Sequence, residues 1–306
     1  MGALSRDALL CFLPLTVIGL AGCRTAALRL ASDAVAHSGG NYATDDDPEL
    51  VRQAAPFGLK TMEGLLEERP RHEGLLTALA SGFTEYAYAF VHTDAELADL
   101  NGQLEAARTG RDRARKLFLR AREYGLRGLE VRHSGMKERL LSGQGLGATL
   151  SVANKGDVPL LYYTASAWVL AISDGKGDMA LVAQLPAAVA MMERALVLDE
   201  AFDEGAIHAF FVAFDATRSP AEGGGPERAR EHLARVEALS GGHDLGAQVS
   251  FAEGVLVQAQ DRARFTEVLS AVLKADPEQA PRHRLANVLA QRRARALLAH
   301  ADDLFV

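Results

Sequence analysis

The clearest pattern of apolar positions in the chain lies between Pro186 and Phe211. Read at helical spacing, its first half places small and large apolar residues on one face: Ala188, Met192, Ala195, Leu196 and Leu198. Asp199 and Glu200 interrupt this pattern, and a second helical pattern starts at Ala201, with Phe202, Ala206, Ala209 and Phe210 on its inward side. The stretch therefore predicts a helix-turn-helix hairpin, whose small residues let the helices approach closely as in a tetratricopeptide-like (TPR-like) unit.

The same order of small and large residues recurs along the chain. Further copies start at Gly58, Ala114, Ala229 and Phe265. The two gaps between starts 188, 229 and 265 are 41 and 36 residues, close to the TPR period of about 34 residues, whereas the earlier gaps are longer. The pattern predicts degenerate repeats with insertions.

Other segments complete a fully helical reading. Asp47 is predicted to cap a helix that begins at Pro48. Strong helical patterns follow over Glu73–His92, over the apolar segment from Pro159, which we expect at the centre, and over Pro281–Ala301. Thr93–Gly110 and Leu126–Lys155 are predicted as connections. No strand pattern occurs in the sequence, so the predicted fold is all-α, a TPR-like helical-hairpin solenoid or bundle with degenerate repeats.

The first residues have the order of a bacterial lipoprotein signal. One positive charge at Arg6 precedes an apolar run from Ala8 to Leu20, too short for a membrane-spanning helix, and Leu-Ala-Gly-Cys follows at positions 20–23. We expect cleavage before Cys23 and acylation of its thiol. The predicted organisation is a signal peptide over 1–22, a lipidated N-terminus and tether over 23–44, and a helical repeat domain over 45–306. Arg24 after the lipid site favours the outer membrane over the inner membrane.

Composition and charge limit the remaining functions. The 306 residues are 48% hydrophobic, with a formal net charge of −7 and no basic stripe, which argues against nucleic acid as a partner. The arginines between 282 and 295 are predicted to form the solvated or ion-paired side of a terminal helix. Of two cysteines, Cys11 lies in the predicted signal and Cys23 would carry lipid, so no disulfide is expected.

No motif for catalysis, metal binding or a cofactor is present in the sequence. The nine histidines form no HExxH pair, and no GxSxG nucleophile motif occurs. The glycines between 143 and 147 lack the strand and the ending of a phosphate loop. His208, beside Phe210, is the one histidine considered for a cleft, with a hydrogen-bonded core histidine as the favoured alternative. The sequence therefore predicts no enzyme, no cofactor and no metal.

Aromatic side chains on the predicted helices are candidates for a ligand cleft or for the core. They are Phe83, Tyr86, Tyr162, Trp168 and Phe210. Aromatic residues serve both uses, and the sequence leaves the two alternatives open.

Taken together, several segments resemble the T component (TatT-type) of tripartite ATP-independent periplasmic (TRAP) transporters. The resemblance lies in DDDPELVRQAAPFGLKTMEGLLEERP, LASGFTEYAYAFV, RARKLFLRAREYGLRGLE, PLLYYTASAWVLAIS, LPAAVAMMERALVLDEAFDEGAIHAFF, FAEGVLVQAQDRARF and LANVLAQRRARALLAHADDLF. It extends in the same order from about Tyr42 to Phe305. Tyr163 is a departure, since Trp is expected there.

The resemblance implies a periplasmic lipoprotein that binds the solute-binding P component of a TRAP transporter. It further implies TPR-like hairpins, homo-oligomers as one form of the protein, and a cleft or pore that could hold a hydrophobic small ligand. The alternative is a general TPR-like scaffold lipoprotein of the cell envelope without a ligand.

Overall fold

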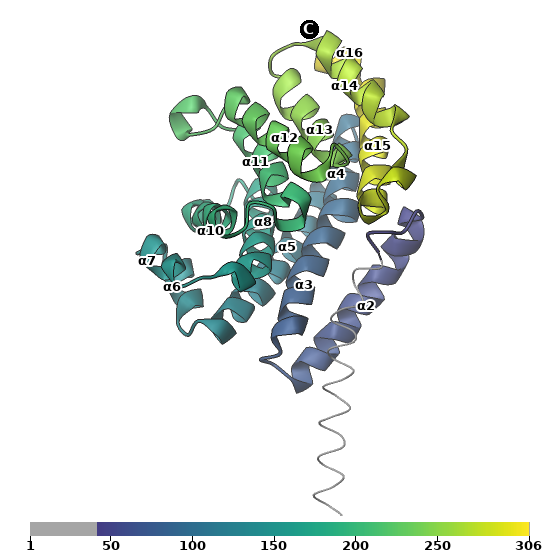
Figure 1. Cartoon of the computed structure of the whole chain (residues 1–306). Coiled ribbons are helices and arrows are strands. Elements are labelled where there is room, and N and C mark those ends of the chain that lie inside the picture. The colour runs from purple at the N-terminus through teal and green to yellow at the C-terminus, as the bar shows by residue number, and fades with distance from the viewer. Residues whose placement is uncertain (1–41, 306) are drawn as a thin grey trace, which may run out of the picture.

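The computed structural model of the protein describes residues 42–305. Every regular element in this range is helical and none is a strand, so the all-α prediction is confirmed. Figure 1 shows the helices packed side by side, with the first described helices at one side and the last ones above and beside them. The TPR-like repeat stays a prediction. The predicted signal peptide and the predicted lipidation site, Cys23, lie outside the described residues.

The described chain opens with α2 (Pro48–Glu68) and α3 (Glu73–Tyr86). The cap predicted for α2 is confirmed: Asp47 Oδ1 accepts hydrogen bonds from the backbone N–H groups of Glu49 and Leu50, at 3.0 and 3.1 Å. Helix α3 runs directly into the π-helical turn η3 (Ala87–His92). The helix predicted over Glu73–His92 is thus present, with a wider last turn.

Two predicted connections are helical, and the predictions there are wrong. Thr93–Gly110 contains α4 (Thr93–Leu100) and the first turns of α5 (Leu104–Arg132). Leu126–Lys155 contains the end of α5, then α6 (Met136–Ser142), α7 (Leu146–Ser151) and the start of the 3-10 turn η4 (Lys155–Asp157). In the first segment the buried apolar residues, Ala95 and Ala107, are few and small. In the second they are spaced among many polar and glycine positions: Leu126, Leu129, Met136, Leu140 and Leu150. Both segments therefore resemble connections in composition.

Helix α8 (Val158–Asp174) lies at the centre, as predicted, and packs against α3, α5 and α10 (Leu185–Leu198). Two glycines of α5 allow its close approach. A Cβ at Gly125 would lie 1.8 Å from Thr164 Oγ1, and one at Gly128 would lie 2.7 Å from Leu160 Cδ2. The crossing of α5 and α8 therefore depends on the absence of side chains at these two positions.

The segment predicted as a hairpin, Pro186–Phe211, comprises α10 and the first turns of α11 (Ala206–Ala216), preceded by the short α9 (Met179–Val182). Helix α10 packs mainly on α8 and α11 mainly on α12 (Pro226–Ser240), so the two helices do not form a closely packed pair. The second helix begins at Ala206 and not at Ala201, because the 3-10 turn η5 (Phe202–Gly205) intervenes with non-helical backbone. By length and hydropathy alone, Met179–Leu198 could cross a membrane. Buried residues of α10, among them Met191 and Met192, pack in the core, which accounts for its apolar composition.

The last part of the chain comprises α12 (Pro226–Ser240), α13 (Leu245–Phe251), the π-helical turn η7 (Ala252–Leu256), α14 (Arg262–Lys274), α15 (Arg284–Ala299) and α16 (Ala301–Leu304). Three 3-10 turns lie between them: η6 (Pro220–Glu222), η8 (Pro277–Gln279) and η9 (Pro281–His283). The predicted inward faces are confirmed at Ala229 and Val236 in α12 and at Phe265, Leu269 and Val272 in α14, all of which are buried.

The buried apolar residues form two cores, and α11 joins them. Phe211 belongs to the first core, built mainly from α2 to α10, and its neighbour Val212 belongs to the second, built mainly from α12 to α16. The start of the described chain lies against the beginning of α15 (Figure 1): Leu285 N–H donates to the Ala43 carbonyl at 3.1 Å. The ion pairs predicted for the terminal arginines are confirmed for Arg282, Arg284, Arg292 and Arg293.

Candidate functional site

Two of the five aromatic side chains considered from the sequence, Phe83 and Trp168, pack inside the first core. Trp168 is fully buried, and its Nε1–H donates to Gln184 Oε1 at 3.1 Å. The guanidinium of Arg122 lies over the Trp168 ring, 4.9 Å from its centroid. Phe83 stacks on Tyr124 with 5.9 Å between centroids. These contacts are those of core residues.

The other three, Tyr86, Tyr162 and Phe210, are only partly buried. Tyr86 lies 5.7 Å from Phe90, and Phe210 stacks on Phe214 at 5.4 Å, between ring centroids. Tyr162 has two rings beside it, Tyr163 and Phe202, and two carboxylates, Asp203 and Glu85, close enough to raise its pKa further after burial. Of the five candidates, Tyr162 therefore marks the site with the most varied chemistry.

Tyr162 and four side chains near it form what we call the inner recess, whose members are Glu85, Tyr162, Tyr163, Phe202 and Asp203. The Tyr162 ring lies 5.0 Å from that of Tyr163 and 5.3 Å from that of Phe202. The Tyr163 hydroxyl donates to Glu85 Oε1 at 2.8 Å. Elements α3, α8 and η5 each supply part of the set, so residues far apart in sequence meet here.

Glu85 has a raised pKa among these side chains. Its side chain reaches solvent, yet burial raises the pKa of Glu85 to about 7, against the lowering effect of the Tyr163 hydrogen bond. Burial also raises the pKa values of Tyr162 and Tyr163, and the negative charges of Glu85 and Asp203 raise them further. The charges of Glu85 and Asp203 therefore give this set of side chains a negative potential.

Asp203 reaches the recess from a strained turn. Asp203, Glu204 and Gly205 have consecutive φ angles of 44°, 54° and 101°, in the left-handed region that non-glycine residues rarely adopt. The turn is held by Glu204, whose Oε2 lies 2.7 Å from His283 Nε2 and whose Oε1 accepts from Arg282. Within residues 42–305, the Asp203 carboxylate makes no hydrogen bond or ion pair. The backbone is therefore strained at a residue whose carboxylate has no hydrogen-bond or ion-pair partner in the described range.

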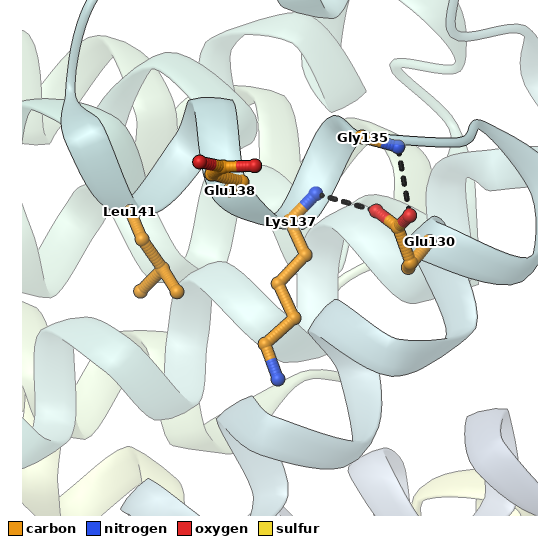
Figure 2. A pocket seen from close by; sticks show the side chains of 5 residues that line it. All are labelled: Glu130, Gly135, Lys137, Glu138 and Leu141. Carbon is orange, nitrogen blue, oxygen red and sulfur yellow. Dashed lines mark hydrogen bonds between the residues drawn. The ribbon is translucent and has the colours of Figure 1, made fainter.

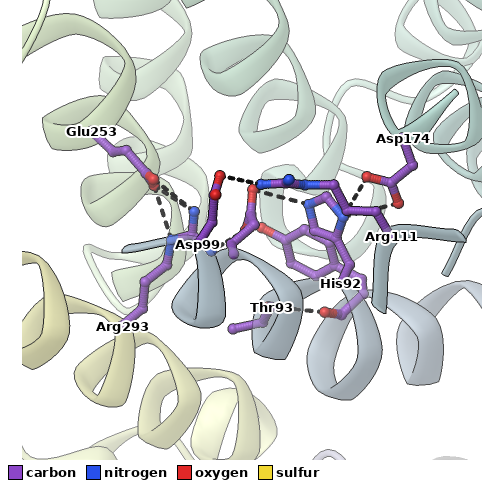
Figure 3. A network of polar contacts seen from close by, with 9 residues as sticks. His92, Thr93, Asp99, Arg111, Asp174, Glu253 and Arg293 are labelled. Carbon is purple, nitrogen blue, oxygen red and sulfur yellow. Dashed lines mark hydrogen bonds and ion pairs between the residues drawn. The ribbon is translucent and has the colours of Figure 1, made fainter. Parts of the chain in front are cut away.

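A buried ionic network joins the two halves of the molecule (Figure 3). His92, at the end of η3, lies 3.0 Å from Asp174 Oδ1 and 3.1 Å from Glu96 Oε1. Arg293 of α15 continues the network to Glu96 at 2.5 Å and to Glu253 of η7 at 2.7 Å. Burial would lower the pKa of His92, but the hydrogen bonds from its ring to Asp174 and Glu96 raise it to about 9. His92 is therefore a charged structural link at neutral pH.

His208 is buried and hydrogen-bonded. Its Nδ1 lies 2.7 Å from Nδ1 of His232 in α12, and its Nε2 lies 3.1 Å from Glu200 Oε1. Burial lowers the pKa of His208, and burial together with the charge of His208 lowers the pKa of His232 to about 4. The pair occupies the packed contact of α11 with α12, where a neutral histidine is the favoured state.

A shallow pocket on the surface lies away from these groups, lined by Glu130, Gly135, Lys137, Glu138 and Leu141 (Figure 2). Its carboxylate is already engaged by the chain itself: Glu130 accepts from the backbone N–H groups of Gly135 and Lys137, at 2.7 and 3.1 Å. The Gly135 bond lowers the pKa of Glu130. Glu130 caps the turn before α6 and is not available to a ligand, and the other carboxylate of the lining, Glu138, is exposed to solvent.

Glu85 and Asp203 are the residues of the inner recess that sequence reasoning missed. Glu85 is one of several polar positions on its helix, and its partner Tyr163 is 78 positions away. The departure at Tyr163 from the expected Trp was the one available signal, because it places a hydroxyl that needs a hydrogen-bond partner at this position. Among residues 42–305, no three His, Cys, Asp or Glu side chains converge in a way that could hold a metal ion.

Comparison with known proteins gives two matches. A model of the family described as TRAP transporter T-component matches residues 44–305, which is nearly the whole described range. An uncharacterized protein of Treponema pallidum (strain Nichols) is 34% identical over 267 residues, covering 87% of this chain and 82% of that relative.

Proposed function

The chain belongs to the TRAP transporter T-component family, and on this premise we propose that it binds the solute-binding P component of such a transporter. The observation that carries the proposal is the extent of the match, residues 44–305, which includes both cores and the inner recess. The family is one of transporter accessory components and not of enzymes. As a component of a TRAP transporter, the protein acts at the cell envelope.

The second part of the proposal concerns anchoring. The lipobox ending in Cys23 supports a periplasm-facing lipoprotein, since an acyl group at this position would tether the helical body to a membrane surface. Arg24 supports the outer membrane over the inner one. The two cysteines provide a matched test: Cys23→Ser should abolish the mass increase of the acyl groups and release the protein from the membrane fraction, whereas Cys11→Ser should change neither. Acylation of the Cys23→Ser variant would refute Cys23 as the residue that carries the lipid.

The third part concerns a ligand. The inner recess contains three half-buried rings beside accessible polar groups, which is the composition of small-molecule sites in proteins. We assign the ligand-binding role to this set rather than to Phe83 and Trp168, whose rings pack against other core residues. No catalytic role is assigned to any of its residues.

Association with the P component is the direct test. The full chain, purified in a non-ionic detergent, is titrated by calorimetry with the solute-binding protein encoded beside it. We expect a dissociation constant in the micromolar range or below, equivalent to about −8 kcal/mol or better. A solute-binding protein from an ABC transporter of the same organism serves as the control and should not bind.

Absence of association at about 100 µM of the P component, a concentration at which even weak specific complexes form, would refute the partner. The general envelope scaffold would then be the better description. Equal binding of both solute-binding proteins would also refute specificity for a TRAP transporter.

A further inference from the structure

The inner recess has a charge that its own residues do not balance. Neither Glu85 nor Asp203 forms an ion pair with a lysine or arginine within residues 42–305. The Tyr163 hydroxyl is the partner of Glu85, and a phenol donates one hydrogen bond without supplying positive charge. Elsewhere in the protein, buried or half-buried carboxylates such as Glu63 and Asp157 are paired with basic side chains. Glu85 and Asp203 have no such basic partner in the described range.

The two carboxylates raise the pKa values of the groups around them. After burial, the charge of Asp203 contributes to the raised pKa of Glu85, so the two carboxylates lie close enough to repel each other. The same two negative charges raise the pKa of Tyr163. A positive charge placed between the carboxylates would relieve this repulsion.

The walls of the recess suit an organic cation better than a metal ion. The rings of Tyr162 and Phe202 are tilted by 55° with 5.3 Å between centroids, and both are only partly buried, so their faces can meet a ligand. Ser166 lies one turn after Tyr162 on the same face of α8 and is 6% exposed, and its hydroxyl is a polar neighbour of Tyr162.

We infer that the inner recess binds an organic cation, whose ammonium group is held by the carboxylates of Glu85 and Asp203 and whose carbon skeleton packs on the ring of Tyr162. The ammonium group donates hydrogen bonds to both carboxylates, and the aromatic faces stabilise its positive charge. This inference rests on the proposal that the recess is a ligand site, and it replaces a purely hydrophobic ligand with a charged one.

The test compares three probes of one shape that differ in charge: 2-phenylethylammonium, 2-phenylethanol and phenylacetate. Each is titrated into the full chain in non-ionic detergent by isothermal calorimetry at pH 8, where Glu85 is ionised. We expect the ammonium probe to bind at least about tenfold more tightly than the alcohol, and the carboxylate not to bind, because a hydrogen-bonded charge pair supplies that discrimination.

Two variants and one control locate the binding site. Glu85→Gln and Asp203→Asn keep the size of the side chain and should each weaken the ammonium probe about tenfold or more. Asn also tolerates the left-handed backbone at position 203. Glu67→Gln removes the same charge from an exposed position of α2 and should leave the affinity unchanged.

Equal affinity for alcohol and ammonium, or unchanged ammonium binding in both recess variants, would overturn the inference while leaving an apolar ligand site in place. Failure of all three probes to bind would overturn the inference together with the ligand site. The partner proposal is read separately, because titration of the Glu85→Gln variant with the P component reports that association without any small ligand.

Discussion

Gly125 and Thr164 meet at the crossing of α5 and α8, where a Cβ on residue 125 would lie 1.8 Å from Thr164 Oγ1 and 2.9 Å from its Cβ. Both partners are fixed, since Thr164 is fully buried and β-branched. The central helix of the fold can therefore approach α5 only because position 125 has no side chain. Helix α8 also packs on α3, which carries Glu85.

The first prediction follows from this contact. Gly125→Ala should lower the free energy of unfolding by about 2 kcal/mol or more, because overpacking forces the two helices apart. Gly64→Ala in α2 is the matched control: no atom lies within 4 Å of its Cβ position, and the substitution should raise stability by about 0.5–1 kcal/mol through helix propensity. Chemical denaturation monitored by circular dichroism measures both. A Gly125→Ala protein as stable as the wild type would contradict the close crossing.

The ionic network of Figure 3 should stabilise the contact between the two halves of the molecule. Arg293→Met leaves the half-buried Glu253 without a cation and Glu96 with His92 alone, so we expect a loss of about 2 kcal/mol. The control is Arg264→Met, which breaks an exposed pair with Glu267 and should cost less than about 0.5 kcal/mol. Equal denaturation midpoints for the two variants would show that the network contributes no more than a surface ion pair.

The histidine pair of α11 and α12 predicts loss of stability in acid. The pKa of His232 falls from 6.5 in the unfolded chain to about 4 in the fold, chiefly through burial, so the unfolded state binds more protons between these values. Stability should decrease as the pH falls from about 6.5 to 4, by up to about 3 kcal/mol from this group. In His232→Phe, the midpoint of denaturation should depend less on pH in this window. A pH profile identical to that of the wild type would exclude the pair as a cause.

Much of the fold could be predicted because its signals are local. The spacing of Ala114, Phe118 and Ala121 predicted a buried helical face, and all three are fully buried. The start of α2 was predicted from Asp47 and Pro48 because a cap involves only the next few residues. Periodicity and capping depend on neighbours in sequence, so a single sequence contains them.

The inner recess could not be predicted in the same way. Its bond between Glu85 and Tyr163 joins α3 to α8, and neither residue has a local pattern that marks it. The second helix of the hairpin was predicted to begin at Ala201, since the composition of residues 202–205 is compatible with a helix. Tertiary contacts of Glu204 with His283 hold the left-handed turn instead.

The titration of Glu85 predicts a pH dependence of ligand binding. Its pKa, raised from 4.5 to about 7 chiefly by burial, means that the carboxylate is lost as the pH falls through 7. The titratable groups that face Glu85 are Tyr163 and Asp203, and Tyr162 lies beside them. Affinity for 2-phenylethylammonium should therefore fall several-fold between pH 8 and pH 6. The Glu85→Gln variant should show a flat profile over this range, and a slope equal to that of the wild type would assign the effect to another group.

The turn that carries Asp203 predicts opposite effects on stability and binding. Asp203→Gly removes a left-handed non-glycine residue, which should raise the free energy of unfolding by about 0.5–1 kcal/mol after the greater entropy of the unfolded chain is counted. The same change removes one of the two carboxylates and should weaken the ammonium probe about tenfold or more. Asp203→Ala separates the two effects, because it also loses the carboxylate but keeps the strain, and it should be less stable than Asp203→Gly. If Asp203→Gly binds the probe as tightly as the wild type, the carboxylate of Asp203 does not bind the ligand. Ligand binding would then not explain why a strained aspartate occupies a position where glycine is more stable.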